Sequence, residues 1–151
     1  MKKKILLVDD DRAVSESVAE VLVAENYIVL PAANGEEALH MAAATRFDLV
    51  LLDLNMPVKN GWDTFERLTA ENPLLPIIIV TARPNQLFAA LAAGVGALIE
   101  KPLDFPRLLK TIRDLLAEPP KLRLARLTGR PAEFHYFPAP RENAPSPRYE
   151  R

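Results

Sequence analysis

The chain has 151 residues, which is enough for one domain of ordinary size and a short appendage but excludes two full domains. Hydrophobic residues make up 49% and charged residues 26%, so the chain can bury a core like that of a soluble globular protein. The absence of cysteine excludes disulfides, thiolate metal sites and cysteine catalysis, and it fits a reducing cytoplasm.

The formal net charge of -1 excludes a globally basic nucleic-acid binder, but it averages two unlike segments. Residues 1–118 have 12 basic and 17 acidic side chains, whereas residues 119–151 have 7 basic and 3 acidic ones and half of the 14 prolines. We therefore expect a folded domain over 1–118. Residues 119–151 should form a proline-rich basic tail without an independent fold, because so short a segment cannot bury a stable core without disulfides or metal.

The basic start of the chain, Met1 to Lys4, is followed by only four apolar residues, Ile5 to Val8, before an acidic run. A signal peptide needs roughly 7–15 apolar residues at this point, and a membrane helix about 20. We therefore expect a cytoplasmic protein that does not bind a membrane.

Five short apolar runs alternate with stretches of helical periodicity over the first 118 residues. The runs are continuous rather than alternating, which is typical of strands that are covered on both faces in a parallel sheet. They are Ile5–Val8, Tyr27–Leu30, Leu49–Leu52, Ile77–Val80 and Ala97–Ile99.

Helix boundaries also have chemical signals. Asn34 and Glu37 have the spacing of a capping box for the second helix, and Pro73 should end the third. Gly94 and Gly96 precede a strand, so they indicate a helix C-cap turn rather than a dinucleotide-binding loop. Five strand–helix units in series predict a doubly wound α/β sheet with helices on both faces.

Polar residues stand at four of the five predicted strand ends, where the working groups of such a sheet lie. Asp9 and Asp10 end the first strand, Asp53 the third, Thr81 the fourth and Lys101 the fifth. Each residue alone is a common turn or cap residue. Because these residues occur together at four strand ends of one sheet edge, the sequence predicts a functional site there.

Three converging carboxylates repel one another, and a hard divalent cation such as Mg²⁺ is the usual remedy. A carboxylate beside such a metal can act as a nucleophile toward phosphorus. Asp53 is the best nucleophile candidate because it ends the central strand. Asp9 and Asp10 are better placed as metal ligands, together with a backbone carbonyl in the following loop, that of Asn55. Thr81 and Lys101 would bind phosphoryl oxygens.

At these positions residues 1–118 resemble the receiver domain of bacterial two-component response regulators. The resemblance rests on the order and spacing of four motifs, which are Ile5-Leu6-Leu7-Val8-Asp9-Asp10-Asp11, Leu51-Leu52-Asp53-Leu54-Asn55-Met56-Pro57 with Gly61, Val80-Thr81-Ala82 and Glu100-Lys101-Pro102. It implies a flavodoxin-like, five-stranded parallel sheet of order 2-1-3-4-5 with five helices, extended here by the proline-rich C-terminal segment.

The resemblance implies a role for each matched residue. Asp53 corresponds to the phosphoacceptor, Asp9 and Asp10 to the Mg²⁺-binding acidic pair, and Asn55 to the backbone-carbonyl metal ligand. Thr81 corresponds to the switch hydroxyl and Lys101 to the phosphate-sensing lysine, whose bond to the following proline is cis in many members. One position departs from the family pattern, because Leu98 stands where receivers usually have the Tyr or Phe that partners the threonine.

The function implied is that of a phosphoacceptor switch, which receives a phosphoryl group from a phosphohistidine and signals by protein–protein interaction. Its donor would be a sensor histidine kinase or a histidine phosphotransfer protein, its downstream protein target is unknown, and the chain could form a homodimer. It would not be an enzyme beyond self-phosphorylation and self-dephosphorylation.

Two other function classes stay open. The basic tail could serve as a nucleic-acid or effector adaptor, although prolines and glutamates dilute its charge and direct DNA binding is not expected. An Asp-nucleophile phosphatase of the haloacid dehalogenase kind ranks far lower, because its nucleophile would stand on the first strand.

Within the tail, Lys121 to Leu124 alternate like an edge strand or docking segment, and Phe134 to Phe137 concentrate aromatic residues. We expect this tail to dock on its own domain or on a neighbouring subunit.

Overall fold

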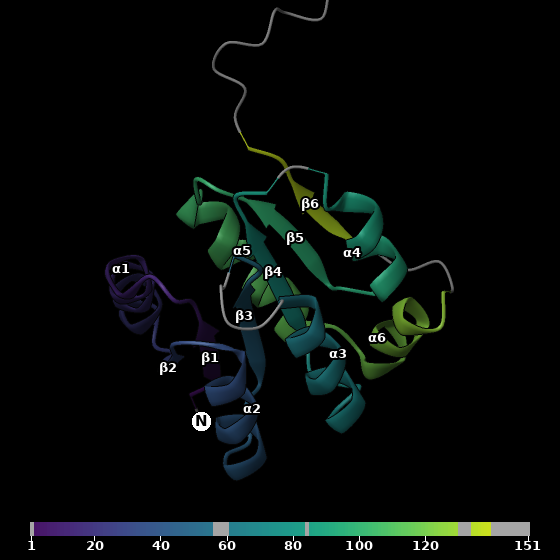
Figure 1. Ribbon diagram of the computed structural model, residues 1–151, viewed down its shortest axis with the longest axis horizontal. Coiled ribbons are helices and arrows are strands. Elements are labelled where there is room, and N and C mark those ends of the chain that lie inside the picture. Colours follow the sequence, from purple (N-terminus) through teal and green to yellow (C-terminus); the bar gives the residue numbers. More distant parts are fainter. Residues whose placement is uncertain (1, 56–60, 84, 130–133, 140–151) are drawn as a thin grey trace, which may run out of the picture.

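The structure is a computed structural model that describes residues 2–55, 61–83, 85–129 and 134–139, and these contain six strands and six helices (Figure 1). The strands are β1 (Lys4–Val8), β2 (Ile28–Ala32), β3 (Leu49–Asp53), β4 (Ile77–Thr81), β5 (Ala97–Glu100) and β6 (His135–Phe137). The helices are α1 (Arg12–Ala24), α2 (Gly35–Ala44), α3 (Gly61–Glu71), α4 (Leu87–Ala93), α5 (Phe105–Ala117) and α6 (Pro120–Leu127).

The strands form one sheet in the order β2-β1-β3-β4-β5-β6, and every pair is parallel. The first five strands confirm the predicted doubly wound sheet and the order 2-1-3-4-5. The bounds of the second strand differ from the predicted Tyr27–Leu30. Strand β2 begins at Ile28 and continues through Pro31 to Ala32, which pairs with Val8. Proline is tolerated there since β2 lies at the edge of the sheet. The sixth strand was not predicted.

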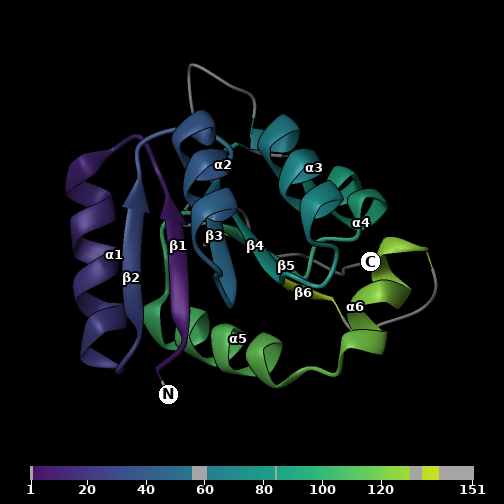
Figure 2. The ribbon, with the colours of Figure 1, turned by 90° about the horizontal axis from the view of Figure 1, so that it is seen from below.

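Helices cover both faces of the sheet, with α1 and α5 on one side and α2, α3 and α4 on the other (Figure 2). The strand side chains alternate between the two layers. Leu52 and Ile79 belong to the core beneath α2, α3 and α4, whereas Leu51 and Ile78 belong to the core beneath α1 and α5. All four side chains are buried. This double burial explains why the predicted strands are continuous apolar runs.

Capping chemistry fixes several helix ends. The side chain of Asn34 accepts a hydrogen bond of 2.8 Å from the backbone N–H of Glu37, which confirms the predicted start of α2. Gly94 ends α4 in the left-handed region, at a φ of 78° that glycine adopts without strain. Asp11 accepts from the N–H of Val14 and caps α1. The third acid of the Asp9-Asp10-Asp11 run therefore serves the helix.

The segment after α5 packs on the domain that precedes it. Residues 121–124 lie in α6, so the edge strand that their alternation suggested is wrong. Pro120 stands in the first turn of this helix, where a missing N–H costs nothing. Farther along, β6 extends the sheet by pairing with β5 (Figure 1). None of the helices in the described ranges is long and apolar enough to cross a membrane.

Two buried arginines hold α6 in place. Arg123 is 2% exposed, and its guanidinium donates hydrogen bonds of 2.6 Å to the carbonyl of Leu75 and 3.4 Å to that of Gly94. Arg126 is 6% exposed and pairs with Glu118. Burial lowers the pKa of Arg123 to about 10, and the nearby charge of Arg126 acts in the same direction. The helix is thus anchored by polar groups as well as by packing.

Candidate functional site

The residues that the sequence singled out meet at the carboxyl edge of the sheet. Asp9 and Asp10 follow β1, Asp53 ends β3, Thr81 ends β4 and Lys101 follows β5. Because all of these strands are parallel, their carboxyl ends lie side by side. The predicted gathering of polar groups at one edge is therefore what the fold produces.

The three carboxylates form a compact cluster. Asp9, Asp10 and Asp53 each offer an oxygen, and these oxygens all lie within 4.8 Å of one another. Asp53 is 3% exposed and Asp9 7% exposed, whereas Asp10 lies on the surface. Oδ1 of Asp9 accepts from the N–H of Asp11 at 2.9 Å, and Oδ1 of Asp53 accepts from the N–H of Asn55 at 2.8 Å. These bonds orient two of the carboxylates and leave their second oxygens for other partners.

Lys101 places an ammonium group against this cluster. Its Nζ donates to Oδ2 of Asp53 at 2.8 Å and lies 4.0 Å from Oδ2 of Asp9. Burial alone would lower the pKa of Lys101, but the hydrogen bond and charge of Asp53, with the charges of Asp9 and Asp10, outweigh it and raise that pKa above its usual value. The lysine is thus kept protonated beside the aspartates.

Asp9 is the member of the cluster whose ionised form the surroundings destabilise. Burial raises its pKa to about 6 from the usual 3.8, the N–H of Asp11 opposes that rise, and the charge of Asp53 adds to it. One ammonium does not balance three carboxylates in so confined a space. The carboxylates therefore repel one another, as the sequence predicted.

Thr81 and Asn55 connect the acidic cluster to β4. Thr81 is fully buried, and its Oγ1 accepts a hydrogen bond of 2.9 Å from the N–H of Arg83. The same hydroxyl donates to Oδ1 of Asn55 at 3.4 Å. The metal-binding role of the Asn55 carbonyl stays a prediction. The contact of its side chain with Thr81 was not foreseen, since it depends on the conformation of the loop after β3.

Sequence reasoning also passed over Glu100. This residue ends β5 directly before Lys101, and it pairs in register with Thr81 on β4. Its two carboxylate oxygens accept hydrogen bonds from Tyr136 and Ala139 of the C-terminal segment. The only signal in the sequence was its position within the Glu100-Lys101-Pro102 motif. The Lys101–Pro102 peptide bond is cis, as it is in many receivers.

The donor set of the cluster fits a hard divalent cation. Carboxylate oxygens are the ligands that Mg²⁺ prefers, and one or two of them commonly bind the ion together with phosphate and water. Three such oxygens within 4.8 Å, on carboxylates whose repulsion a cation would relieve, are typical of a Mg²⁺ site.

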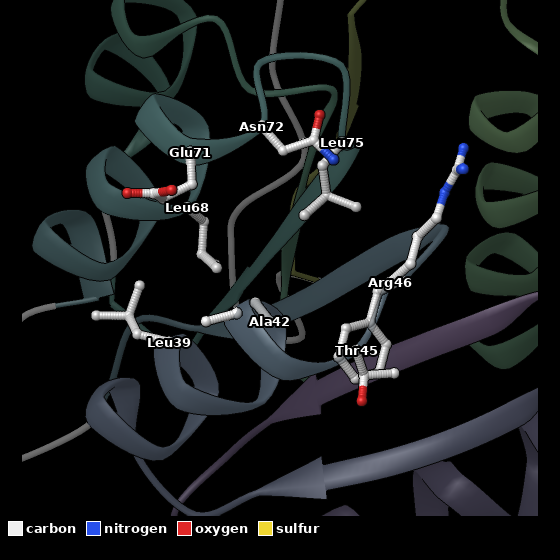
Figure 3. Close-up of a pocket in the computed structure, with 10 residues that line it drawn as sticks. Leu39, Ala42, Thr45, Arg46, Leu68, Glu71, Asn72 and Leu75 are labelled. Atoms are coloured by element: carbon white, nitrogen blue, oxygen red, sulfur yellow. The ribbon is translucent and has the colours of Figure 1, made fainter.

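A separate pocket of about 280 Å³ lies between α2 and α3, at the opposite edge of the sheet (Figure 3). Phe47 and Leu75, which line it, stand two residues before the starts of β3 and β4. The acidic cluster, by contrast, lies where the strands end. Apolar side chains make up most of the lining, with Arg46 and Glu71 among its polar members. This pocket therefore contributes nothing to the acidic site.

Known proteins are similar to this chain in sequence and in fold. Residues 5–113 match the response regulator receiver domain family. The curated response regulator MprA of Mycolicibacterium vanbaalenii is 40% identical over 118 residues, which cover 77% of this chain and 51% of that protein. MprA of Mycobacterium leprae is 41% identical over 115 residues, 75% of this chain and 50% of that protein. The chain thus spans about half the length of the curated relatives it matches.

Solved structures agree. A CheY-like response regulator receiver domain protein of Methanospirillum hungatei has a TM-score of 0.73 at 33% identity, covering 77% of this chain and 94% of that one. The response regulator TrrA of Thermotoga maritima, solved in complex with Mg²⁺–BeF, has a TM-score of 0.70 at 30% identity. The match covers 75% of this chain and 98% of that one. The fold and the acidic pocket define a phosphoacceptor signalling module rather than a classical enzyme. The chain belongs to the response regulator receiver domain family.

Proposed function

We propose that Asp53 is the residue that accepts the phosphoryl group, and that a phosphohistidine of a sensor histidine kinase or of a histidine phosphotransfer protein donates it. An oxygen of Asp53 forms the new O–P bond while the N–P bond of the phosphohistidine breaks, and its electron pair returns to the imidazole. Lys101 then exchanges its bond to Asp53 for one to a phosphoryl oxygen, and the hydroxyl of Thr81 donates to another.

The contact between Lys101 and Asp53 carries this proposal. An aspartate that is 3% exposed at the end of the central strand needs a cationic partner, and the Nζ of Lys101 supplies it at 2.8 Å. The same ammonium is already within reach of the place where a phosphoryl group on Asp53 would carry its negative charge. No rearrangement of the sheet is needed to bring these two side chains together.

Asp9, Asp10 and Asp53, with the backbone carbonyl of Asn55, would hold Mg²⁺. When bound, the ion would offset the repulsion between the carboxylates and the incoming phosphoryl group. The clustering of the three carboxylates and the raised pKa of Asp9 support this assignment. The assignment is also supported by TrrA, a protein similar to this chain, whose structure was solved in complex with Mg²⁺–BeF.

The donor protein would dock beside Lys101. An apolar groove of about 440 Å³ runs between α1 and the β5–α5 connection, and it is lined by Val14, Val18, Lys101 and Leu103 among others.

We propose that the protein works in the cytoplasm and signals by protein–protein contact, as its family membership supports. A nucleic-acid adaptor role is disfavoured, because two of the seven basic side chains of residues 119–151, Arg123 and Arg126, are buried.

Phosphorylation by acetyl phosphate with Mg²⁺ tests the assignment. Phosphate-affinity electrophoresis should show a shifted band for the unaltered protein and none for Asp53→Asn, and hydroxylamine should remove the shift, as it does for an acyl phosphate. Asp63→Asn is the matched control, because Asp63 lies in a surface ion pair with Arg67 on α3. A shift that survives Asp53→Asn, or one that resists hydroxylamine, would overturn the proposal.

A further inference from the structure

The chain leaves the sheet beside the apolar groove that lies between α1 and the β5–α5 connection. Strand β6 runs parallel to β5, so it ends at the edge where β5 ends (Figure 1). The N–H of Ala139, the last described residue, donates to Oε1 of Glu100 at 3.0 Å. Glu100 directly precedes Lys101, which lines the groove. Residues 140–151 lie outside the described part of the chain, and they begin next to this groove.

The groove presents apolar surface that is only partly covered. We call it the α1–α5 groove, and its walls are residues of α1 between 13 and 18 and residues between 101 and 105. Val14, Leu103 and Phe105 pack on the core beneath α1 and α5, yet they are only half-buried and line the groove. An apolar side chain that enters would remove water from these residues. The groove therefore favours an occupant with an apolar anchor.

The sequence of residues 140–151 offers one such anchor. Tyr149 is the single aromatic residue of this segment, whose other apolar residues are three prolines and one alanine. A tyrosine buries a large apolar ring while its hydroxyl stays near water. Proline-rich segments lose little conformational entropy when they bind in an extended form, because proline already restricts the backbone. The segment thus combines an aromatic anchor with a backbone that is inexpensive to order.

The charges on the two sides are complementary. Glu16 on α1 and Asp104 before α5 are exposed and directly adjoin residues that line the groove. Each forms an exposed ion pair within its own helix or helix cap, and such pairs contribute little and exchange partners readily. Arg148 stands directly before Tyr149. Its guanidinium would find a carboxylate on either wall.

The segment is long enough to reach the groove. Glu100 and Phe105 are five residues apart, so their Cα atoms are separated by at most about 18 Å. From Ala139 to Tyr149 the chain has ten residues and can span about 33 Å. Because Ala139 is bonded to Glu100, Tyr149 can reach the whole wall formed by residues 101–105. Tethering at this length gives an effective concentration in the millimolar range, so even a weak anchor is sufficient.

We propose that residues 140–151 occupy the α1–α5 groove of their own chain, with Tyr149 as the anchor, and compete there with the donor protein. The contact is autoinhibitory, because the donor must displace the segment before its phosphohistidine reaches Asp53. A small donor such as acetyl phosphate needs no groove and is not slowed. This inference rests on the proposed function of Asp53 and on the groove as the donor's docking place.

Paramagnetic relaxation enhancement on the full chain tests where the segment lies. Because the sequence contains no cysteine, Glu150→Cys creates a single attachment point for a nitroxide next to Tyr149. The nitroxide should broaden the amide signals of Val14 and Leu103, whereas those of α2, on the opposite face of the sheet, stay sharp (Figure 2). Tyr149→Ala on the labelled chain should remove most of the broadening. Asn143→Ala, in the same segment, is the matched control and should leave it in place.

A substitution in the groove tests the contact from the other side. Ser17 is exposed and lines the groove, and lysine is a better helix former than serine, so Ser17→Lys should fold. Its long charged side chain would occupy part of the groove and reduce the broadening. Ala44→Lys changes an exposed position at the end of α2 and should have no such effect.

The competition itself is measured with two donors. At a limiting concentration of a phosphohistidine protein that labels the unaltered chain, Tyr149→Ala should be labelled roughly two- to tenfold faster. This range follows if the tethered segment fills the groove from about half to about nine-tenths of the time. With acetyl phosphate the two proteins should be labelled at the same rate.

The outcomes that would overturn the inference are distinct from those that would overturn the proposed function. Groove amides that stay sharp, or that are broadened equally in Tyr149→Ala, would show that the tyrosine does not hold the segment there. Broadening of ¹⁵N-labelled chains by separate nitroxide-labelled chains would assign the groove to a neighbouring subunit's segment instead. Equal labelling of Tyr149→Ala and the unaltered chain by the protein donor would refute the competition. If acetyl phosphate does not label Asp53 although the groove amides are broadened, the proposed function fails while the contact stands.

Discussion

Replacing Asp9 with asparagine should stabilise the metal-free protein at neutral pH. Asp9 is 7% exposed and lies within 4.8 Å of two other carboxylates, and burial raises its pKa from 3.8 to about 6. Each pKa unit corresponds to 1.36 kcal/mol, so ionised Asp9 lowers the free energy of unfolding by roughly 3 kcal/mol. Asparagine has nearly the same shape, and its Oδ1 can still accept from the N–H of Asp11.

The pH dependence has a definite sign. Below the unfolded-state pKa near 4, Asp9 is protonated in both the folded and the unfolded state, and it imposes no penalty. Between about pH 4 and pH 6 the folded state holds a proton that the unfolded state has lost, so stability falls as the pH rises. Above about pH 6 the penalty is complete. The advantage of Asp9→Asn should therefore be small at pH 4 and reach its plateau near pH 7.

Urea unfolding in EDTA, followed by the fluorescence of the single tryptophan, Trp62, measures this difference. Asp11→Asn is the matched control, because Asp11 caps α1 at the surface and asparagine caps equally well. Adding Mg²⁺ should narrow the gap by stabilising the unaltered protein through binding. Equal stability of the Asp9→Asn and unaltered proteins at pH 7, or a gap that does not change with pH, would show that Asp9 is not a strained carboxylate.

Three further substitutions probe the packing. Gly35→Ala should cost about 2 kcal/mol, because its Cβ would lie 2.0 Å from Oγ1 of Thr64, and adding Thr64→Ala should restore most of that loss in urea unfolding. Glu118→Gln should cost about 3 kcal/mol, since it removes the charge that neutralises buried Arg126, and Arg126→Met in the same chain should recover part of it. Gly94→Ala should speed amide exchange in α6, because φ is 78° and the new Cβ would lie 2.8 Å from the carbonyl oxygen of Arg126; unchanged exchange would show that this contact does not hold the helix.

The gathering of the site residues was predictable because topology alone places them. Once the apolar runs ending before Asp9 and at Asp53 are taken as parallel strands, the residues that follow must lie at one edge. The same holds for Thr81 and Lys101. What topology does not set is the conformation of the loops, and for that reason the contact between Asn55 and Thr81 was missed.

The attachment of the C-terminal segment could not be predicted from local pattern. Charged side chains are almost never fully buried, so Arg123 in a basic, proline-rich stretch indicates a solvated surface. Its burial depends on the carbonyls of Leu75 and Gly94, which reach the same place only after the domain has folded. Likewise β6 has only three residues, too few for a hydrophobic period to identify a strand.

The C-terminal segment nevertheless reaches its place in the sheet by a crossover connection, as the other parallel strands do. A strand parallel to β5 must begin at the edge where β5 begins, so the chain has to cross back over the sheet first. Helix α5 makes that crossing, and α6 contacts Leu75 and Gly94, which precede β4 and β5, so it lies at that starting edge. The next strand can then only run parallel to β5, as β6 does. Helix α5 and the residues that follow it thus form one more crossover unit, and this unit places Tyr136 opposite Leu98, the position where the family's aromatic residue is missing.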